Sequence, residues 1–198
     1  EHTRRAVEAL RANEESPRSA LYVFSDGAAS PAQESAVGEV RDYIRTIDGF
    51  ASVSLIERDR NLGLADSIVG GVTQLCDEHG RVIVVEDDLI VSPGFLEYMN
   101  QALDRYAGED RVMQIAGHMF PVDLSGLEDD AVFLPITTSW GWATWARAWR
   151  HMKRGRDNYD WIAASKSRRH QFDANGSFPY LEMLKNNVDG KISSWAIE

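Results

Sequence analysis

Three consecutive carboxylates, Glu86, Asp87 and Asp88, follow the most apolar stretch of the chain, residues 82–85. An apolar run without alternation is typical of a strand in the middle of a parallel sheet. The acids are then expected at the carboxyl end of that strand, where open α/β sheets bind ligands. Such oxygens suit Mg²⁺ or Mn²⁺, which relieve the repulsion between like charges and are often held together with substrate phosphates. The residues alone leave two interpretations open, a metal–phosphate site and a solvated acidic turn.

Two other loops are expected at the same edge of the sheet. Asp26 follows an apolar strand at residues 20–24, and its carboxylate can accept hydrogen bonds from a nucleobase or a ribose. Asn61 and Gly63 follow a second strand, at residues 51–56, and open a helix. Each loop alone is explained equally well by an ordinary turn. Because three loops converge on one edge, the pattern favours a site for a metal and a nucleotide.

These loops depend on elements that alternate along the first half of the chain. Apolar residues at helical spacing predict one helix that ends before Ser16 and further helices over residues 31–47, 64–75 and 93–103. Apolar runs predict strands at residues 20–24, 51–56, 81–85, 112–116 and 132–134. This alternation predicts an open, mostly parallel α/β sheet with helices on both faces.

The second half differs in composition, because all 6 Trp residues lie between Trp140 and Trp195. Basic residues also cluster over residues 147–169. We therefore expect a single domain, residues 1–198, with a nucleotide-binding half at 1–117 and an aromatic, acceptor-side half at 118–198. An open α/β domain normally begins with a strand, and this chain begins in a predicted helix, so we expect it to be a fragment of a longer protein.

The composition limits the class of protein further. A length of 198 residues with 43% hydrophobic and 26% charged residues excludes disordered, collagenous and coiled-coil chains. The net charge of −10 argues against a broad nucleic-acid-binding surface. Cys76 is the only cysteine, which fits a reducing compartment. No apolar run approaches the ~20 residues of a membrane span. We expect no nucleic acid partner, no transmembrane segment and a cytoplasmic location.

Taken together, the motifs resemble those of GT-A fold glycosyltransferases. They are similar in particular to bacterial nucleotide-sugar transferases related to the N-acetylglucosaminyltransferase I group, which carry a Glu-Asp-Asp form of the Asp-x-Asp motif. The resemblance spans roughly residues 20–198 in motif order. Its motifs are residues 24–27 (Phe-Ser-Asp-Gly), 60–65 (Arg-Asn-Leu-Gly-Leu-Ala), 84–88 (Val-Val-Glu-Asp-Asp) and 92–95 (Ser-Pro-Gly-Phe). It implies an open, mostly parallel sheet flanked by helices, here without the family's first strand.

The resemblance also implies roles for single residues. Asp88 matches the acid that holds Mn²⁺ or Mg²⁺ on the donor diphosphate. Glu86 matches the acid that meets the ribose, and Asp87 the acid close to the donor sugar. Asp26 matches the residue that recognises the base, usually uracil. The loop with Asn61, Gly63 and Leu64 matches the part of the family's site that lines the nucleoside.

The aromatic segment resembles the family's segment beside the donor sugar and the acceptor. We expect Trp140 and Trp142 near the site, and Trp145 and Trp149 in the core as neighbours on one helix. His118 follows a strand toward the same region, where we interpret it as a structural loop histidine.

One family feature is missing. The family's general base is an aspartate just ahead of a tryptophan like Trp195, whereas Ser193 and Ser194 stand there in this chain. The nearest acids are Asp189 and Glu198, and neither matches the motif position.

The resemblance therefore implies metal-dependent, inverting transfer of a sugar from a nucleoside diphosphate, in particular UDP, to an acceptor hydroxyl such as that of a glycan. The alternative is a catalytically impaired module that binds sugar nucleotides or glycans, which the serines favour. Nucleotidyl transfer on the same fold ranks lower, because such enzymes usually carry a Gly-rich loop with Arg and Lys after their first strand, and that region is absent here.

Overall fold

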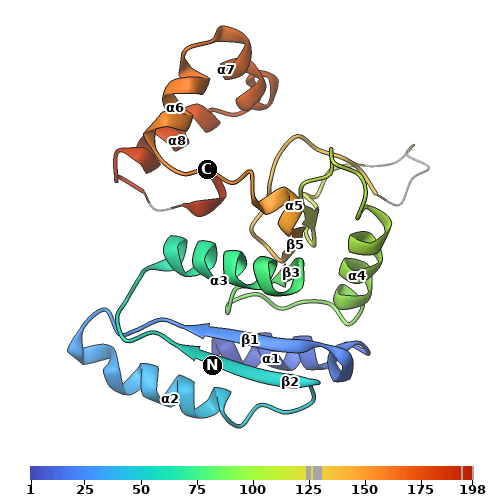
Figure 1. Ribbon diagram of the computed structural model, residues 1–198, viewed down its shortest axis with the longest axis vertical. Coiled ribbons are helices and arrows are strands. Elements are labelled where there is room, and N and C mark those ends of the chain that lie inside the picture. Colours follow the sequence, from blue (N-terminus) through green and yellow to red (C-terminus); the bar gives the residue numbers. More distant parts are fainter. Residues whose placement is uncertain (124–125, 127–130, 193, 198) are drawn as a thin grey trace.

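The computed structural model describes residues 1–123, 126, 131–192 and 194–197, and it contains two small sheets with helices around them (Figure 1). Strand β1 (Ala20–Ser25) pairs in parallel with β2 (Ser52–Glu57). The connection between them is a short 3-10 turn, η2 (Pro31–Gln33), followed by α2 (Glu34–Ile44). The predicted strands at residues 20–24 and 51–56, and the helix between them, are confirmed.

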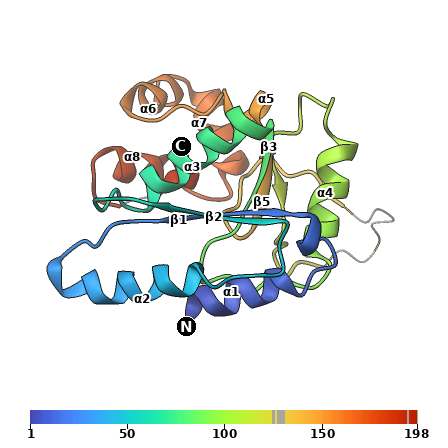
Figure 2. The ribbon, with the colours of Figure 1, turned by 60° about the horizontal axis from the view of Figure 1, so that its bottom comes forward.

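Helices cover both faces of this parallel pair. Helices α1 (His2–Arg11) and α2 lie on one face and α3 (Leu64–His79) on the other (Figure 2). The guanidinium of Arg4 on α1 lies 4.4 Å from the ring centroid of Tyr43 on α2, which holds the two helices together. The ring of Phe24 on β1 packs directly on the backbone of α3 at Gly71, where a Cβ would meet it at 3.2 Å.

The second sheet corrects the prediction for the apolar strand at residues 81–85. Strand β3 (Arg81–Val84) pairs antiparallel with β5 (Trp142–Trp145), which pairs on its other side with β4 (Ile115–Ala116). Among the described residues β3 is thus an edge strand of an antiparallel sheet, not the centre of a parallel one. Its apolar character has another cause, because helices cover both of its faces.

The two faces of β3 belong to two different core clusters. Val82 and Val84 pack in the cluster that contains Val72 and Cys76 of α3. Ile83 packs instead in the cluster around α4 (Phe95–Arg105). A strand between two helices needs apolar side chains on both sides, so it shows no alternation.

The tryptophan-rich segment forms a strand where a helix was expected. Trp142 and Trp145 lie in the α3 and α4 clusters respectively, on opposite faces of β5, and the helix α5 (Ala146–Trp149) begins only afterwards. The prediction that Trp145 and Trp149 share one helix is therefore wrong.

One strand prediction was too long and another was wrong. Of residues 112–116 only the pair in β4 is a strand, and residues 132–134 form none. Phe133 and Leu134 are exposed, so apolar residue type alone misled the prediction there.

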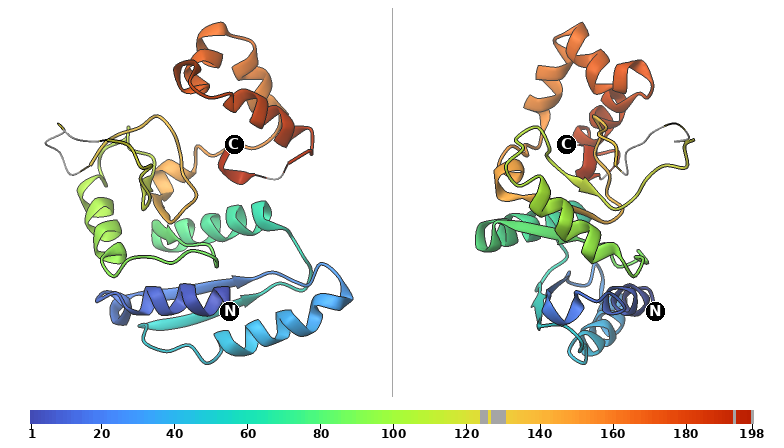
Figure 3. Two further views of the ribbon diagram at one scale, coloured as in Figure 1. Left: turned by 180° about the vertical axis from the view of Figure 1, so that it is seen from behind. Right: turned by 90° about the vertical axis from the view of Figure 1, so that its right-hand side faces the viewer.

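The C-terminal part is helical. The helices α6 (Arg156–Ala163), α7 (Lys166–Phe172) and α8 (Tyr180–Val188) form a group far from β1 and β2 (Figure 3). Short 3-10 turns complete the described elements: η1 (Ser16–Arg18), η3 (Ala174–Gly176) and η4 (Trp195–Ile197). In η4, Trp195 stacks on Trp142 with ring centroids 4.8 Å apart, which returns the chain to α3.

Within the described part of the chain, no helix is both long and apolar enough to cross a membrane. Cys76 is buried and unpaired, as expected for the only cysteine.

Candidate functional site

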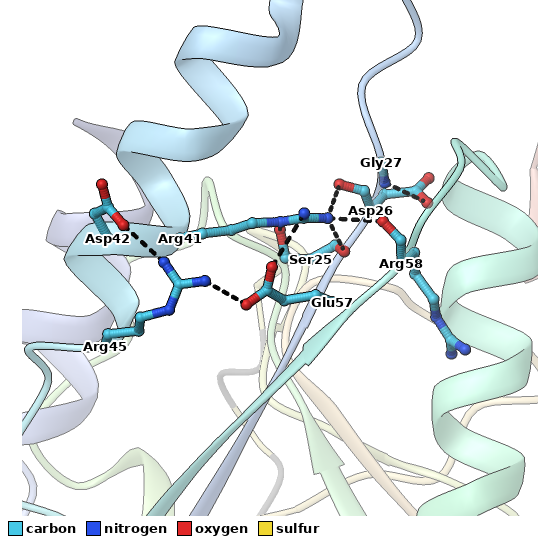
Figure 4. Close-up of polar contacts among 8 residues, drawn as sticks. All are labelled: Ser25, Asp26, Gly27, Arg41, Asp42, Arg45, Glu57 and Arg58. Carbon is cyan, nitrogen blue, oxygen red and sulfur yellow. Dashed lines mark hydrogen bonds and ion pairs between the residues drawn. The ribbon is translucent and has the colours of Figure 1, made fainter.

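One guanidinium joins the carboxyl ends of β1 and β2. Arg41 of α2 donates from Nη2 to three backbone carbonyl oxygens, those of Ser25 at 3.3 Å, Asp26 at 3.3 Å and Arg58 at 2.8 Å (Figure 4). Its Nε donates to the Ser25 hydroxyl at 3.1 Å, and its Nη1 pairs with Glu57 at 3.1 Å. Arg41 thus fixes the position at which both strands release their loops.

Asp26 in turn holds the loop that opens α3. Its carboxylate accepts backbone N–H groups from Leu62, at 2.9 and 3.0 Å, and from Gly63, at 2.9 Å. The N–H of Gly27 also donates to it, at 3.0 Å. Asn61 closes the same contact from the other side, since its Nδ2 donates to the Gly27 carbonyl at 2.9 Å. Three of the residues predicted to line a nucleoside site, Asp26, Asn61 and Gly63, therefore already serve to tie two loops together.

The close approach of the two loops requires glycine at position 27. A Cβ on Gly27 would lie 2.4 Å from the carbonyl carbon of Arg60. Gly63, at the N-terminus of α3, has a φ of +79°, a conformation that favours glycine. Leu64 follows it and is 54% exposed, so its side chain is accessible to a ligand at this edge.

The acidic turn after β3, residues 86–88, has few polar partners, in contrast to Asp26. Glu86 is half-buried, and its pKa is raised by burial first and then by the charges of Asp88 and Asp87. Asp87 and Asp88 are exposed, and Asp87 accepts one long hydrogen bond, 3.4 Å, from the Thr3 hydroxyl. No ion pair to these acids is found within the described residues. The turn is thus an uncompensated patch of negative charge.

This turn suits a metal shared with a substrate better than a metal held by protein alone. Over the described residues, no group of three or more His, Cys, Asp or Glu side chains converges on one point. Exposed carboxylates such as that of Asp88 offer the hard oxygen ligands that Mg²⁺ and Mn²⁺ prefer. These ions commonly take one or two protein carboxylates and complete their shell with phosphates and water.

The two tryptophans predicted near the substrate separate in the structure. Trp140 is 51% exposed and borders a cavity next to the acidic turn. Trp142 is only 1% exposed and packs in the core, which corrects its prediction as a substrate contact. The alternation of β5 turns it toward α3. Trp145, predicted in the core, is buried there, and its Nε1 donates to the Leu103 carbonyl at 3.1 Å.

Asp189, one of the two acids considered as a general base, is surrounded by cations. It accepts hydrogen bonds from Arg156 and Lys185, both at 2.7 Å, and Lys191 lies 3.8 Å away. The hydrogen bonds from Lys185 and then from Arg156 lower the pKa of its carboxyl. A carboxylate stabilised in this way is a weak proton acceptor. Ser193 and the other acid, Glu198, lie outside the described residues.

A second cavity, of about 260 Å³, lies between α3 and α5. Cys76 lines it, but burial, with a smaller effect of Asp77, raises the pKa of the thiol to about 11. A thiol with so high a pKa is no nucleophile near neutral pH.

Sequence reasoning missed Arg41, because its charge is indistinguishable from those of the exposed residues on α2. Arg41 lies one helical turn before Arg45, and both pair with Glu57. This spacing of two arginines is the only local signal in the sequence that could have indicated its role.

Comparison with known proteins gives no match: no family model matches the chain, and neither a curated protein nor a solved structure does.

Proposed function

We propose that this chain is a metal-dependent glycosyltransferase domain, which transfers a sugar from a nucleoside diphosphate, in particular UDP, to an acceptor hydroxyl. The observation that carries the proposal is the acidic turn of Glu86, Asp87 and Asp88. It follows a strand directly, lacks a cationic partner among the described residues and borders a cavity with an exposed tryptophan.

In this proposal Asp88 holds Mn²⁺ or Mg²⁺ together with the donor diphosphate. The bound metal neutralises the negative charge of the leaving diphosphate. Glu86 accepts hydrogen bonds from the ribose, and Asp87 lies toward the donor sugar. The raised pKa of Glu86 supports this arrangement, because a cation at the turn offsets the repulsion from its neighbours.

The loops at the ends of β1 and β2 form the nucleoside side of the proposed site. Gly63 is hydrogen-bonded to Asp26 and Asn61 to the carbonyl of Gly27, which lets the loop meet a base without first being ordered. Leu64 is exposed beside them and offers an apolar contact to the base.

We also propose that the fold is of the GT-A type. Within the described residues, β1 pairs only with β2, and β3 only with β5, so each has one unpaired edge. Helix α3 packs on both sheets, because Gly71 contacts Phe24 of β1 and Val72 lies in the cluster with Val82 and Val84 of β3. One further parallel strand between β1 and β3 would join the two sheets into a single, mostly parallel one, since unpaired strand edges are ready to bind another strand.

Thermal unfolding with UDP, GDP, CDP and dTDP, each with Mn²⁺ or with a chelator, tests the proposal. We expect UDP with Mn²⁺ to raise the unfolding temperature of the wild type, because a ligand at about 100 times its Kd stabilises by ~2.7 kcal/mol. The variant Asp88→Asn should lose this shift, and the matched control Asp110→Asn, an exposed acid elsewhere, should keep it. An equal shift in the presence of chelator, or in Asp88→Asn, would contradict the metal site.

The second candidate function is a binding module that holds sugar nucleotides or glycans without transferring sugar. The ion pairs of Asp189 favour it, because they weaken the one described acid considered as a base. Release of UDP from UDP-sugars, followed with and without a glycan acceptor, separates the two functions. Binding with no release would support the module, and steady release that requires Mn²⁺ would exclude it.

A further inference from the structure

The cavity beside the acidic turn has a volume of about 220 Å³. This is smaller than the ~300–1,000 Å³ of pockets for drug-sized ligands, so it suits one ring rather than a whole nucleotide. The segment directly after the acids forms one wall, and the ends of β4 and β5 form the other. Its lining residues are Leu89, Ile90, Val91, Ser92, Phe95, Gly117, His118, Trp140 and Gly141.

Two glycines shape the floor of this cavity. Gly117 donates its N–H to the carbonyl of Gly141 at 2.7 Å, and the ring of Phe95 lies directly beneath both. A Cβ on Gly117 would meet this ring at 2.5 Å and a Cβ on Gly141 at 3.0 Å. Gly141 also has a φ of +68°. The floor is therefore built from backbone and a buried ring, so the cavity exists before any ligand arrives.

The rings of His118 and Trp140 line the cavity, and the ring of Phe120 packs against both of them. The ring of His118 lies edge-to-face with Trp140, at a centroid distance of 4.7 Å and an angle of 88°, and with Phe120, at 5.7 Å and 82°. Trp140 and Phe120 remain 51% and 39% exposed. Because His118 braces both rings, their accessible surfaces are held ready for a ligand at little entropic cost.

This combination of groups matches a pyranose. A sugar ring has C–H groups on its faces, which suit aromatic and aliphatic surfaces, and hydroxyl groups around its rim, which need polar partners. The cavity offers the aliphatic Ile90 and the ring of Trp140 together with the polar side chains of Ser92 and His118. The exposed carboxylates of the acidic turn, close by in sequence, are further acceptors for hydroxyl groups.

We propose that this cavity, with the rings of His118, Phe120 and Trp140, is a pre-formed pyranose-binding site that holds the acceptor sugar without nucleotide or metal. Binding of a sugar follows from the cavity and its rings. Its assignment to the acceptor rests on the proposed transferase function, because the site borders the turn at which the donor diphosphate would bind.

The indole N–H signals of the 6 Trp residues in a ¹⁵N NMR spectrum test the site directly. The protein, in chelator and without nucleotide, is titrated with methyl β-N-acetylglucosaminide, methyl β-galactoside and methyl α-mannoside. We expect at least one of them to move the Trp140 signal saturably in the millimolar range. The matched control is Trp161, which is 62% exposed on α6 and stacks with Arg168, and whose signal should stay in place.

Variants then define the contribution of each ring. Phe120→Leu and His118→Ala should each weaken sugar binding about three- to tenfold, the usual size of one aromatic contact. Saturation-transfer NMR observed on the sugar should lose its signal with Trp140→Ala and keep it with Trp161→Ala. The remaining indole signals report in each case whether the variant is folded.

Failure of this site and failure of the transferase proposal give different results. If UDP binds with Mn²⁺ but none of the three sugars moves the Trp140 signal, the transferase stands and the sugar site is overturned. If a sugar moves it but no nucleotide binds, the sugar site is supported and its role as an acceptor site is overturned. Sugar binding that persists in Trp140→Ala would also overturn the site.

Discussion

The carboxyl ends of β1 and β3 both release an acid into a loop, and the two acids meet opposite surroundings. Asp26, after β1, accepts three backbone N–H groups, and Arg41 holds the carbonyl oxygens beside it. Glu86, after β3, has two acids as neighbours and no cationic partner in the described chain. The first region satisfies its polar groups internally, whereas the acids of the second form no ion pair within the described residues. A carboxylate after a strand thus ties loops together in one place and stays without a cationic partner among the described residues in the other.

The largest expected loss of stability comes from replacing Arg41, the residue at the centre of the first region. Arg41→Ala removes the guanidinium that donates to three carbonyl oxygens and leaves Glu57 with Arg45 alone, so we expect a loss of about 3 kcal/mol in the free energy of unfolding. Arg45→Ala is the matched control, because its ion pairs with Asp42 and Glu57 are more exposed and should contribute less than about 1 kcal/mol. Urea denaturation measures both. Equal losses would show that Arg41 is no more than a surface charge.

The next effect tests the contact between the two loops of that region. Gly27→Ala drives a Cβ into the backbone of Arg60 and should cost about 2 kcal/mol. Gly38→Ala, in the middle of α2 with open space around it, should instead stabilise the protein by about 0.5–1 kcal/mol. Chemical denaturation of the two variants in parallel checks this. Stabilisation by both substitutions would mean that the loops are not in close contact.

A third pair of variants compares the acids directly. Asp26→Asn replaces an acceptor oxygen with an amide donor that faces backbone N–H groups, so we expect a loss of about 1.5 kcal/mol. Asp88→Asn removes only a repulsive charge from an exposed side chain and should leave stability within about 0.5 kcal/mol of the wild type. Thermal unfolding without ligand distinguishes them. A larger loss of stability in Asp88→Asn than in Asp26→Asn would contradict the contrast between the two acids.

The smallest effect concerns pH. The pKa of Glu86 is higher in the folded state than its usual value of 4.5, so the folded state disfavours the ionised form. Its favourable contribution is complete below pH 4.5 and is lost as the pH rises through the folded-state pKa. Glu86→Gln should therefore match the wild type near pH 4 and be more stable at pH 7, by about 0.5 kcal/mol for a half-exposed charge.

Denaturation curves between pH 4 and pH 7 measure this difference. The exposed Glu39→Gln on α2 is the control and should give a pH-independent offset. A Glu86→Gln variant that is less stable than the wild type at pH 7 would show that the carboxylate is stabilised by a partner.

Much of the fold could be predicted from local pattern. The apolar runs of β1, β2 and β3, the helical spacing of α3, and the turn residues near Asp26 and Gly63 all appear where they were expected. These features depend on side-chain period and on backbone preferences over a few residues. The candidate acids were found in the same way, since they follow directly from an apolar strand.

The sequence by itself determined the order of helices and strands in the first half, the single unpaired cysteine and the acids that leave the strands. Only the tertiary structure decided that β3 pairs antiparallel with β5, that Trp142 is buried while Trp140 is exposed, and that Arg41 holds two strand ends. It also brought Gly117 and Gly141 together over Phe95 to form a cavity. The physical reason is the range of the interactions. Side-chain period and turn preference act within a few residues, whereas strand pairing, burial and cavity shape depend on groups that are distant in sequence.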